Sequence, residues 1–307
     1  MLQTPLQKNG CFQVTYPDMN WQEVPCTTAP TYPQLPLSNS TNKSVGNFNS
    51  YAAQVPGTIS STTGSFDSVT GLTSETGNKF SSDCSSYIPD VRNTFTLQLN
   101  TNVFSTTVSG CDQHPGCKGW QQFVYSNSGK LYIQNWLIDY GPPCPKDWTS
   151  FGDDCYSGSS ATSVPAQAIE NLAQLSLTAN VTGTMNTVIL SIRNNKYWAT
   201  DQLSAISQDN VLGLAQDWDT AEFNLFGDGC SSQANFNAGT TIQVRLNIAS
   251  NPMSVPTCLS TGFTEETNNL DLRSCSSFGA AGTPAGIMFI EDNNNTRMST
   301  GLAARGR

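Results

Sequence analysis

Glu222 has the clearest capacity for acid–base chemistry in this sequence. It lies in the run Thr-Ala-Glu-Phe-Asn-Leu-Phe at 220–226, whose alternation of side chains predicts a β-strand. The period of two places Glu222 on one face of that strand together with Asn224 and Phe226. A carboxyl group beside an amide and an aromatic ring can have a raised pKa, which suits a general acid or base. The alternative is a solvent-facing glutamate on an outer sheet.

A second candidate surface lies at 130–140, where Tyr132, Gln134, Trp136 and Tyr140 share one face of a predicted strand. Rows of aromatic rings bind sugars or peptide chains, and an amide in such a row can donate a hydrogen bond to a developing oxyanion. Because this strand is apolar on both faces, the same aromatic residues are equally consistent with a buried core.

The strand predicted just upstream, at 119–126, places Trp120 and Gln122 on one face. We expect these two residues to contribute to a substrate-binding surface. The expected surface consists of Trp120, Gln122, Tyr132, Trp136, Tyr140 and Asn224.

Other common catalytic groups are missing from the sequence. The only histidine is His114, which stands between Cys111 and Cys117 beside Pro115, and we interpret it as a structural residue of a short stapled loop. There is no Gly-x-Ser-x-Gly motif and no phosphate-binding glycine loop. A histidine-based metal site cannot be assembled. We therefore expect carboxylate and amide chemistry that uses no metal and no cofactor.

The composition narrows the class of partner. The 307 residues carry 23 acidic and 14 basic side chains, and the net charge is -9. This balance argues against a nucleic-acid partner, because phosphate binding needs a basic surface. No run of about 18 apolar residues predicts a membrane-spanning helix. The first five residues lack the basic and apolar regions of a signal peptide, and we expect the mature part of a secreted, extracellular protein.

The ten cysteines predict disulfide bonds, since their number is even and no Cys-x-x-Cys pair occurs. Disulfide bonds form in oxidising compartments. The alternative, a structural zinc site, is disfavoured because paired ligands at short spacing are missing. Spacing alone leaves several connectivities open. Proximity along the chain favours the pairs Cys11–Cys26, Cys111–Cys117, Cys144–Cys155 and Cys258–Cys275, with Cys84–Cys230 as the remaining long-range pair.

Four sequons agree with an extracellular location. They begin at Asn39, Asn42, Asn180 and Asn294. Glycans on these asparagines would place them on the surface. Chance occurrence is the alternative, because the chain is rich in Asn, Ser and Thr.

The composition and the pattern of strand and turn residues divide the chain into three predicted regions. Residues 1–50 read as an N-terminal stapled arm and linker, broken by prolines, and residues 296–307 as a frayed tail. Between them, 51–295 read as one β-sandwich or barrel with helices only at 165–175 and 209–216. The predicted strands are 54–59, 65–71, 94–100, 119–126, 130–140, 176–181, 187–193, 196–200, 220–226, 240–249 and 285–292.

These motifs together resemble the glutamic peptidases of the eqolisin type. The run Lys-Leu-Tyr-Ile-Gln-Asn-Trp-Leu-Ile-Asp-Tyr at 130–140, after the Trp120 strand, looks like the glutamine-bearing strand of that family. The runs at 220–226 and 234–240 resemble its glutamate-bearing strand and its Ala-Asp/Asn-Phe-Gly segment, and 64–71 resembles its opening strand. The order agrees over residues 51–250. Neprosin-like glutamate peptidases are more faintly similar, and the chain also looks like a broad set of uncharacterised secreted microbial proteins.

The resemblance implies an antiparallel, two-sheet, concanavalin-like β-sandwich with a concave active face. It implies an endopeptidase active in acid without a metal or a histidine. Glu222 matches the family glutamate, which would activate water as a general base and then protonate the leaving amine. Gln134 matches the family glutamine, whose amide would stabilise the tetrahedral oxyanion.

Two other functions remain open from the residues themselves. The aromatic row of Tyr132, Trp136 and Tyr140 is also typical of a lectin-like module that binds glycans without catalysis. The polar, weakly charged composition with dense disulfides is also compatible with an extracellular structural or assembly protein. The partner is thus a polypeptide or a glycan, and neither the particular substrate nor the oligomeric state follows from the sequence.

Overall fold

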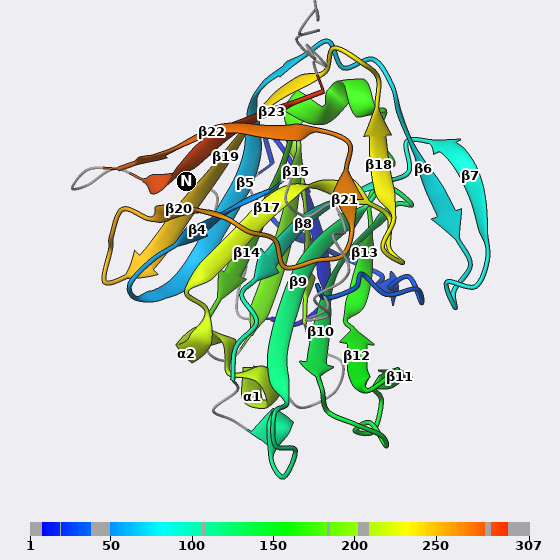
Figure 1. The fold of residues 1–307 in the computed structure, drawn as a ribbon, viewed down its shortest axis with the longest axis vertical. Helices are drawn as coiled ribbons and strands as arrows, with labels where there is room; N and C mark the ends of the chain where they lie inside the picture. Colours follow the sequence, from blue (N-terminus) through cyan, green and yellow to red (C-terminus); the bar gives the residue numbers. More distant parts are fainter. Residues whose placement is uncertain are drawn as a thin grey trace, which may run out of the picture.

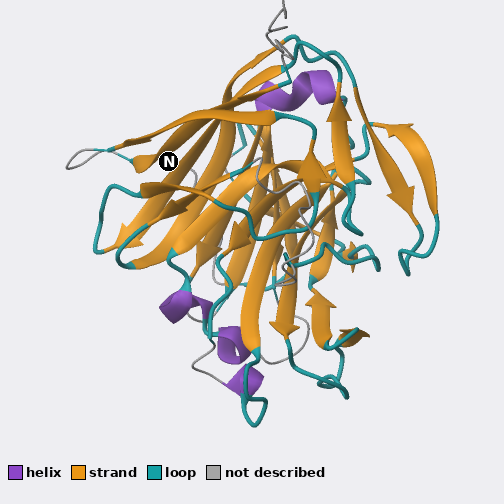
Figure 2. Ribbon diagram, in the orientation of Figure 1, coloured by secondary structure: helices purple, strands orange, loops and turns teal. Residues whose placement is uncertain are grey.

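The computed structural model describes residues 8–18, 20–37, 50–105, 109–182, 185–201, 209–279 and 284–293. Most of these residues are in β-strands, and the helical segments are few and short (Figure 2). The predicted all-β class is therefore confirmed. The expected tail at 296–307 and most of the expected linker before Ser50 lie outside the described residues.

One layer of the sandwich is a nine-stranded sheet, here called sheet I. Every pairing within it is antiparallel. Residues of the predicted N-terminal arm take part in this sheet, because β1 pairs with β16. In spatial order the strands are β2 (Gln22–Val24), β1 (Cys11–Thr15), β16 (Asn195–Thr200), β15 (Asn186–Ile192), β14 (Leu175–Val181), β5 (Thr58–Thr70), β19 (Thr241–Asn251), β23 (Ala285–Asp292) and β22 (Asp271–Phe278).

The second layer, sheet II, is a ten-stranded sheet that carries both runs singled out above. Figure 1 shows β17, β8, β9 and β10 side by side in front of β5, β14 and β15. The main path is β11 (Thr149–Phe151), β12 (Asp154–Gly158), β10 (Lys130–Ile138), β9 (Lys118–Ser126), β8 (Phe95–Thr101), β17 (Thr220–Gly227), β4 (Tyr51–Gln54) and β20 (Thr257–Ser260). Off this path, β13 (Ser160–Ser163) pairs with β10 and β3 (Thr27–Thr28) pairs with β13.

A smaller four-stranded sheet flanks sheet II. Its order is β21 (Thr267–Asn268), β18 (Gln233–Phe236), β6 (Glu75–Phe80) and β7 (Tyr87–Arg92), and β18 and β21 are parallel. The helices within the described residues are α1 (Asp209–Leu212), α2 (Leu214–Asp217) and the 3-10 helices η2 (Ser109–Cys111) and η3 (Ile169–Gln174). No helix in the described part of the chain is long and apolar enough to cross a membrane.

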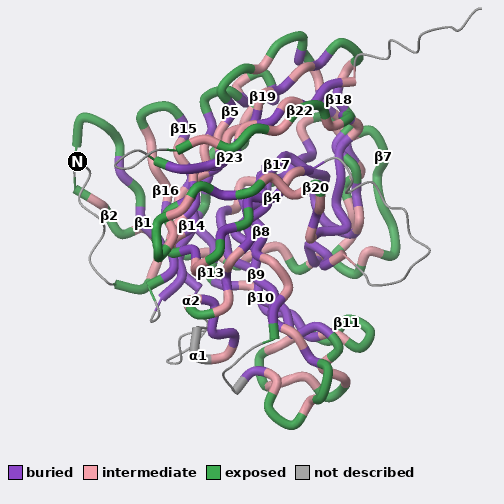
Figure 3. Tube along the Cα trace, turned by 60° about the vertical axis from the view of Figure 1, so that its left-hand side comes forward, coloured by how far each residue is buried: buried purple, intermediate pink, exposed green. Residues whose placement is uncertain are grey.

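The hydrophobic core lies between sheets I and II. Alternation sends Leu97, Phe123, Ile133 and Phe223 from sheet II toward this core, and all four side chains are buried. Phe223 lies directly on the backbone of β5, since a Cβ atom at Gly64 would stand 2.1 Å from its ring. The central strands β8, β9, β10 and β17 are buried along most of their length (Figure 3). Their other face therefore cannot be solvent-exposed and must be covered.

Most predicted strands are confirmed, with ends displaced by one or two residues. The strand predicted at 54–59 is wrong, because β4 ends at Gln54 and β5 begins at Thr58. Pro56 and Gly57 separate them, and both residue types disfavour a continuous strand. The expectation at 65–71 covers only the second half of the long strand β5.

One of the two predicted helices is corrected. The expected helix at 209–216 is confirmed as the short helices α1 and α2. At 165–175 the structure has only the 3-10 helix η3, and Leu175 already begins strand β14. Leu175 and Leu177 are buried against the core, and this strand pairing outweighs the local helix signal.

All five predicted disulfide pairs are confirmed. They join Cys11 to Cys26, Cys84 to Cys230, Cys111 to Cys117, Cys144 to Cys155 and Cys258 to Cys275. Only the first involves the N-terminal arm, and it closes within the arm.

Candidate active site on a covered sheet face

Gln134 and Glu222 lie on the same face of sheet II and in the same row across the strands. Gln134 of β10 is opposite Gln122 of β9, Gln122 is opposite Asn100 of β8, and Asn100 is opposite Glu222 of β17. Side chains of directly opposed residues project to the same face of a sheet. Three strand spacings separate Gln134 from Glu222, or about 14 Å between their Cα atoms. Gln122 and Asn100 therefore stand between the two expected catalytic residues.

The Glu222 side chain is buried and is surrounded by hydrogen-bond donors. One carboxylate oxygen accepts hydrogen bonds from Asn100 Nδ2 at 3.0 Å and from the main-chain N–H of Phe263 at 2.9 Å. Burial raises the pKa of Glu222 to about 7, although the hydrogen bonds from Asn100 and Phe263 act in the opposite direction. The solvent-facing alternative for Glu222 is wrong, because its exposed fraction is 0%.

The amides beside Glu222 retain unused hydrogen-bonding capacity. Asn100 Oδ1 and Gln122 Oε1 are buried and have no hydrogen-bond partner among the described residues. Buried polar atoms of this kind are rare in folded proteins, and each can accept a hydrogen bond from a further donor. The centre of the row therefore carries two acceptor atoms that a donor could use next to the carboxyl group.

This face is covered by residues 31–37, which we call the strap. The main-chain N–H of Gln34 donates a hydrogen bond of 2.9 Å to Oε1 of Gln134. Further along the strap, Leu37 donates through its main-chain N–H to the carbonyl oxygen of Phe263 at 2.9 Å. The strap face, meaning the face of sheet II that carries Gln134 and Glu222, is thus occupied by an extended segment of the same chain.

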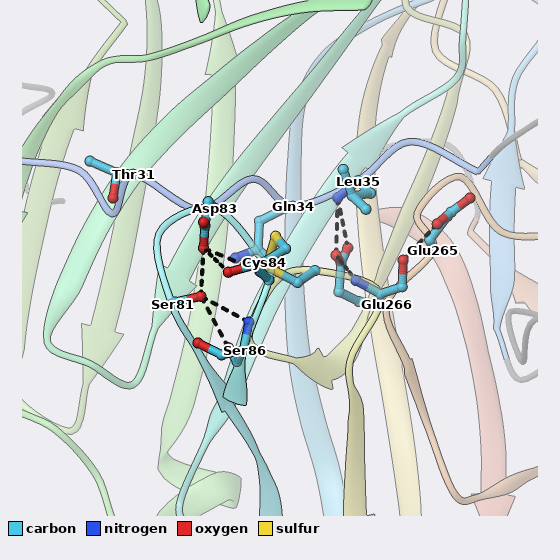
Figure 4. The surroundings of a disulfide bond; sticks show 12 residues. Thr31, Gln34, Leu35, Ser81, Asp83, Cys84, Ser86, Glu265 and Glu266 are labelled. Carbon is cyan, nitrogen blue, oxygen red and sulfur yellow. Dashed lines mark hydrogen bonds between the residues drawn. A yellow bond between two sulfur atoms is a disulfide. The ribbon is translucent and has the colours of Figure 1, made fainter. Parts of the chain in front are cut away.

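Glu266 holds the middle of the strap. The N–H of Leu35 lies 3.0 Å and 3.2 Å from the two carboxylate oxygens of Glu266, as the dashed lines in Figure 4 show. Ser231 N–H and the Thr264 hydroxyl donate to the same carboxylate. Burial raises the pKa of Glu266 to about 7, against the lowering effect of these donors. Figure 4 also shows the strap passing beside the disulfide of Cys84.

The expected substrate-binding residues are buried beneath this cover. Trp120, Gln122, Tyr132 and Trp136 lie on the strap face, and none of the four is open to solvent. Asn224 is also buried and donates a hydrogen bond of 3.0 Å to Glu291.

Tyr140 lies apart from this group. Its ring stacks on His114 with ring centroids 3.6 Å apart, and His114 Nδ1 lies 2.7 Å from the Tyr140 carbonyl oxygen. These contacts agree with the structural interpretation of His114. The structure therefore brings all the expected binding residues except Tyr140 close to the row, and it shows them in a covered state.

Three further buried carboxyl groups have a raised pKa. Burial raises the pKa of Asp228 to about 6, while hydrogen bonds from Tyr32, Ser126 and Gln34 lower it. Burial raises the pKa of Glu75 and of Glu291 to about 8. Glu75 and Glu291 are therefore mostly protonated at neutral pH, whereas Asp228 is mostly ionised there.

The sequence reasoning missed three important residues of the site: Gln34, Asn100 and Glu266. Asn100 lies at the end of a predicted strand, and its parity with Gln98 was a usable signal. Gln34 and Glu266 lie in irregular segments, where local periodicity carries no information about contacts. Within the described ranges, no set of three His, Cys, Asp or Glu side chains converges as metal ligands.

The sequons are only partly described. Asn180 lies on β14 and is half-buried, accepting from Ser61 and donating to Thr187. Asn39, Asn42 and Asn294 lie outside the described residues.

The chain matches no protein-family model, and no curated protein matches it significantly. The resemblance to glutamic peptidases therefore stays a prediction.

Proposed function

We propose that this chain is a secreted hydrolase of the glutamic-peptidase kind whose substrate face is occupied by its own strap. One observation carries the proposal. The strap lies on the Gln134–Glu222 face as an extended segment held through its main chain, with Gln34 N–H bonded to Gln134 and Leu35 N–H bonded to Glu266. A face that holds an extended chain by its main-chain groups has the properties that a polypeptide substrate needs.

Under this proposal the reaction is peptide-bond hydrolysis. The Glu222 carboxylate removes a proton from a water molecule, and the water oxygen bonds to the carbonyl carbon of the substrate. An amide of the row, from Gln134 or Gln122, donates a hydrogen bond to the oxyanion that forms. When the C–N bond breaks, the proton passes from Glu222 to the leaving nitrogen.

The electrostatics of the covered form agree with this role. Burial keeps the pKa of Glu222 at about 7, so the group is protonated in acid and cannot act as a base. Displacement of the strap together with the Phe263 segment, which is bonded both to the strap and to Glu222, would admit water and lower the pKa of Glu222 toward its ordinary value. The proposed enzyme would then have its base ionised in the acid range.

The glycan-binding alternative has less support from the geometry. It requires aromatic rings open to solvent, whereas Tyr132 and Trp136 have exposed fractions of 1% and 0%. The five disulfides support an extracellular location, because such bonds persist in oxidising compartments.

The test is to displace the strap and measure proteolysis. We expect Gln34→Arg, which puts a larger charged side chain into a fully buried position, to release the strap and allow cleavage of denatured casein between pH 2 and 6. Adding Glu222→Gln should abolish that cleavage. The matched control is Thr31→Ala, whose side chain is exposed in the same segment. Absence of cleavage by Gln34→Arg, or equal cleavage after Glu222→Gln is added, would contradict the proposal.

A further inference from the structure

The two central side chains of the strap enter two different pockets on the strap face. Gln34 and Leu35 are both buried, and the main chain on either side of them is hydrogen-bonded to neighbouring segments. We propose that these pockets are side-chain subsites, and that the ligands of this face are extended peptides with a glutamine followed by a leucine-sized apolar residue. This inference rests on the proposed function only in so far as the bound peptides are taken to be substrates.

The first pocket is built from polar side chains of three adjacent strands. Gln98 Nε2 of β8 donates to Gln34 Oε1 at 3.0 Å, and Gln34 Nε2 donates to the Tyr132 hydroxyl of β10 at 3.3 Å. Gln122 of β9 donates to Gln98 Oε1 at 3.1 Å. This last bond orients the Gln98 amide, so that its NH2 end is the one presented to the ligand. The pocket thus has one fixed donor.

The opposite side of the pocket accepts a hydrogen bond from the ligand. The Gln34 amide nitrogen donates to the Tyr132 hydroxyl, and the nearby Asp228 carboxyl group accepts from Tyr32 at 2.9 Å and from Ser126 at 3.1 Å. A carboxamide satisfies both requirements, because its oxygen accepts from Gln98 and its nitrogen donates. A glutamate offers no donor when ionised and would stand beside Asp228. An apolar residue would leave the Gln98 N–H unpaired in a buried site, and sites built around hydrogen bonds reject such ligands strongly.

The second pocket is apolar and surrounds Leu35. Leu35 forms one hydrophobic cluster with Trp120, Trp136, Ile138 and Tyr156, all of them buried. Trp120 is held in place by its Nε1 bond to the Thr101 carbonyl oxygen at 2.8 Å, and Trp136 stacks on Tyr156 with ring centroids 5.1 Å apart. Rigid aromatic walls of this kind select an apolar side chain by its size.

Main-chain contacts complete the subsites without regard to sequence. The carbonyl oxygen of Leu35 accepts from the Glu265 N–H at 2.9 Å and lies 3.0 Å from the Thr264 hydroxyl oxygen, while the Leu35 N–H donates to Glu266. Both main-chain polar groups of Leu35 are therefore paired. Any extended peptide can make these bonds, and only its side chains at the two pockets distinguish one ligand from another.

The strap is held on this face without a covalent link of its own. The disulfide of the arm closes between Cys11 and Cys26, and the other four disulfides join residues within the body of the protein. A free peptide that fills both pockets can therefore compete with the strap once the strap has lost its own side chains.

The experiment uses the full chain and a fluorescent peptide copy of the strap, Thr-Tyr-Pro-Gln-Leu-Pro. The double variant Gln34→Gly/Leu35→Gly empties both pockets. By fluorescence polarisation we expect it to bind the peptide at least about tenfold more tightly than the wild type or Thr31→Ala does. Peptides with the glutamine replaced by glutamate or leucine, or the leucine replaced by aspartate, should bind at least about tenfold more weakly.

The peptide series keeps the inference separable from the proposed function. Equal affinity for all four peptides would overturn the subsites, even if denatured casein is cleaved. Selective binding without any cleavage would support the subsites and contradict the hydrolase. Near-UV circular dichroism of the double variant confirms that its sandwich is intact, and a Gln98→Leu change in the same background should remove the preference for glutamine over leucine at the first pocket.

Discussion

The main-chain N–H of Gln34 donates a hydrogen bond of 2.9 Å to the side-chain oxygen of Gln134. Both residues are buried, at the place where the strap crosses sheet II. This bond uses the acceptor end of the Gln134 amide, whereas stabilisation of an oxyanion needs the donor end. Under the proposed function, the strap therefore occupies the position of a substrate without bonding to the atom that the reaction requires.

Opening of the strap can be measured through individual amides. Leu35→Ala removes most of a side chain buried among aromatic rings, and such truncations cost about 2–5 kcal/mol. We expect amide exchange at Leu37 and Glu265, both bonded across the strap, to accelerate by at least about 30-fold, since 1.4 kcal/mol corresponds to tenfold. Hydrogen exchange read by mass spectrometry checks this. Met253→Ala, whose residue is 67% exposed, is the control and should change nothing there. Unchanged protection in Leu35→Ala would show that the strap is held by its main chain alone.

The protein should be more stable in acid than near pH 8. The folded-state pKa values of Glu75 and Glu291 are about 8, and those of Glu222 and Glu266 about 7, all above the ordinary value near 4.3. Between these values the folded chain binds more protons than the unfolded chain, so the free energy of unfolding falls as pH rises. The stabilisation is complete below about pH 4 and is lost as pH passes through 7 to 8.

Thermal unfolding by calorimetry checks that pH dependence. We expect the melting temperature at pH 4.5 to exceed that at pH 8 by at least about 5 °C, because a few kcal/mol shifts the melting temperature of a large domain by several degrees. A melting temperature that rises steadily from pH 4.5 to pH 8 would show that these buried carboxyl groups are ionised in the folded protein.

A single substitution should isolate the contribution of Glu291 to the pH dependence of the free energy of unfolding. Glu291→Gln keeps an oxygen that can accept from Asn224 and removes the titrating proton. We expect the change to stabilise the protein at pH 8 by about 1–3 kcal/mol and to have little effect at pH 4.5, since one pKa unit corresponds to 1.36 kcal/mol. Urea unfolding at both pH values measures it. Glu23→Gln, on an exposed side chain, is the control, and a similar gain there would contradict the assignment to Glu291.

The amide that assists Glu222 can be identified by comparing two glutamines. The register places Gln122 one strand closer to Glu222 than Gln134 is. In the Gln34→Arg background, we expect Gln122→Ala to lower kcat by about 100-fold, the usual effect of removing an oxyanion donor, and Gln134→Ala to lower it less. Steady-state kinetics on a chromogenic peptide measures both. Full kcat in Gln122→Ala with loss in Gln134→Ala would restore the assignment made by family resemblance.

The central strands of sheet II were predictable from the sequence because their signal is local. Alternation of side chains along 119–126, 130–140 and 220–226 correctly placed Gln134 and Glu222 on faces shared with polar neighbours, although both faces of these strands are buried. The edge strands β7 and β22 were missed because they are largely exposed and polar, with no burial pattern to reveal them. The disulfide pairs were predictable because four of them close short loops.

The sequence by itself determined which residues share a face within each strand, together with the all-β class, and it favoured the disulfide pairs without fixing them. Only the tertiary structure decided that β10 and β17 belong to one sheet with two strands between them, and that residues 31–37 cover that face. The physical reason is the separation along the chain of the residues that interact. Side-chain alternation is fixed by neighbouring peptide units, whereas the bonds from Gln34 to Gln134 and from Leu35 to Glu266 join residues 100 and 231 positions apart. Contacts at such separations depend on the packing of the whole chain, so no local sequence pattern predicts them.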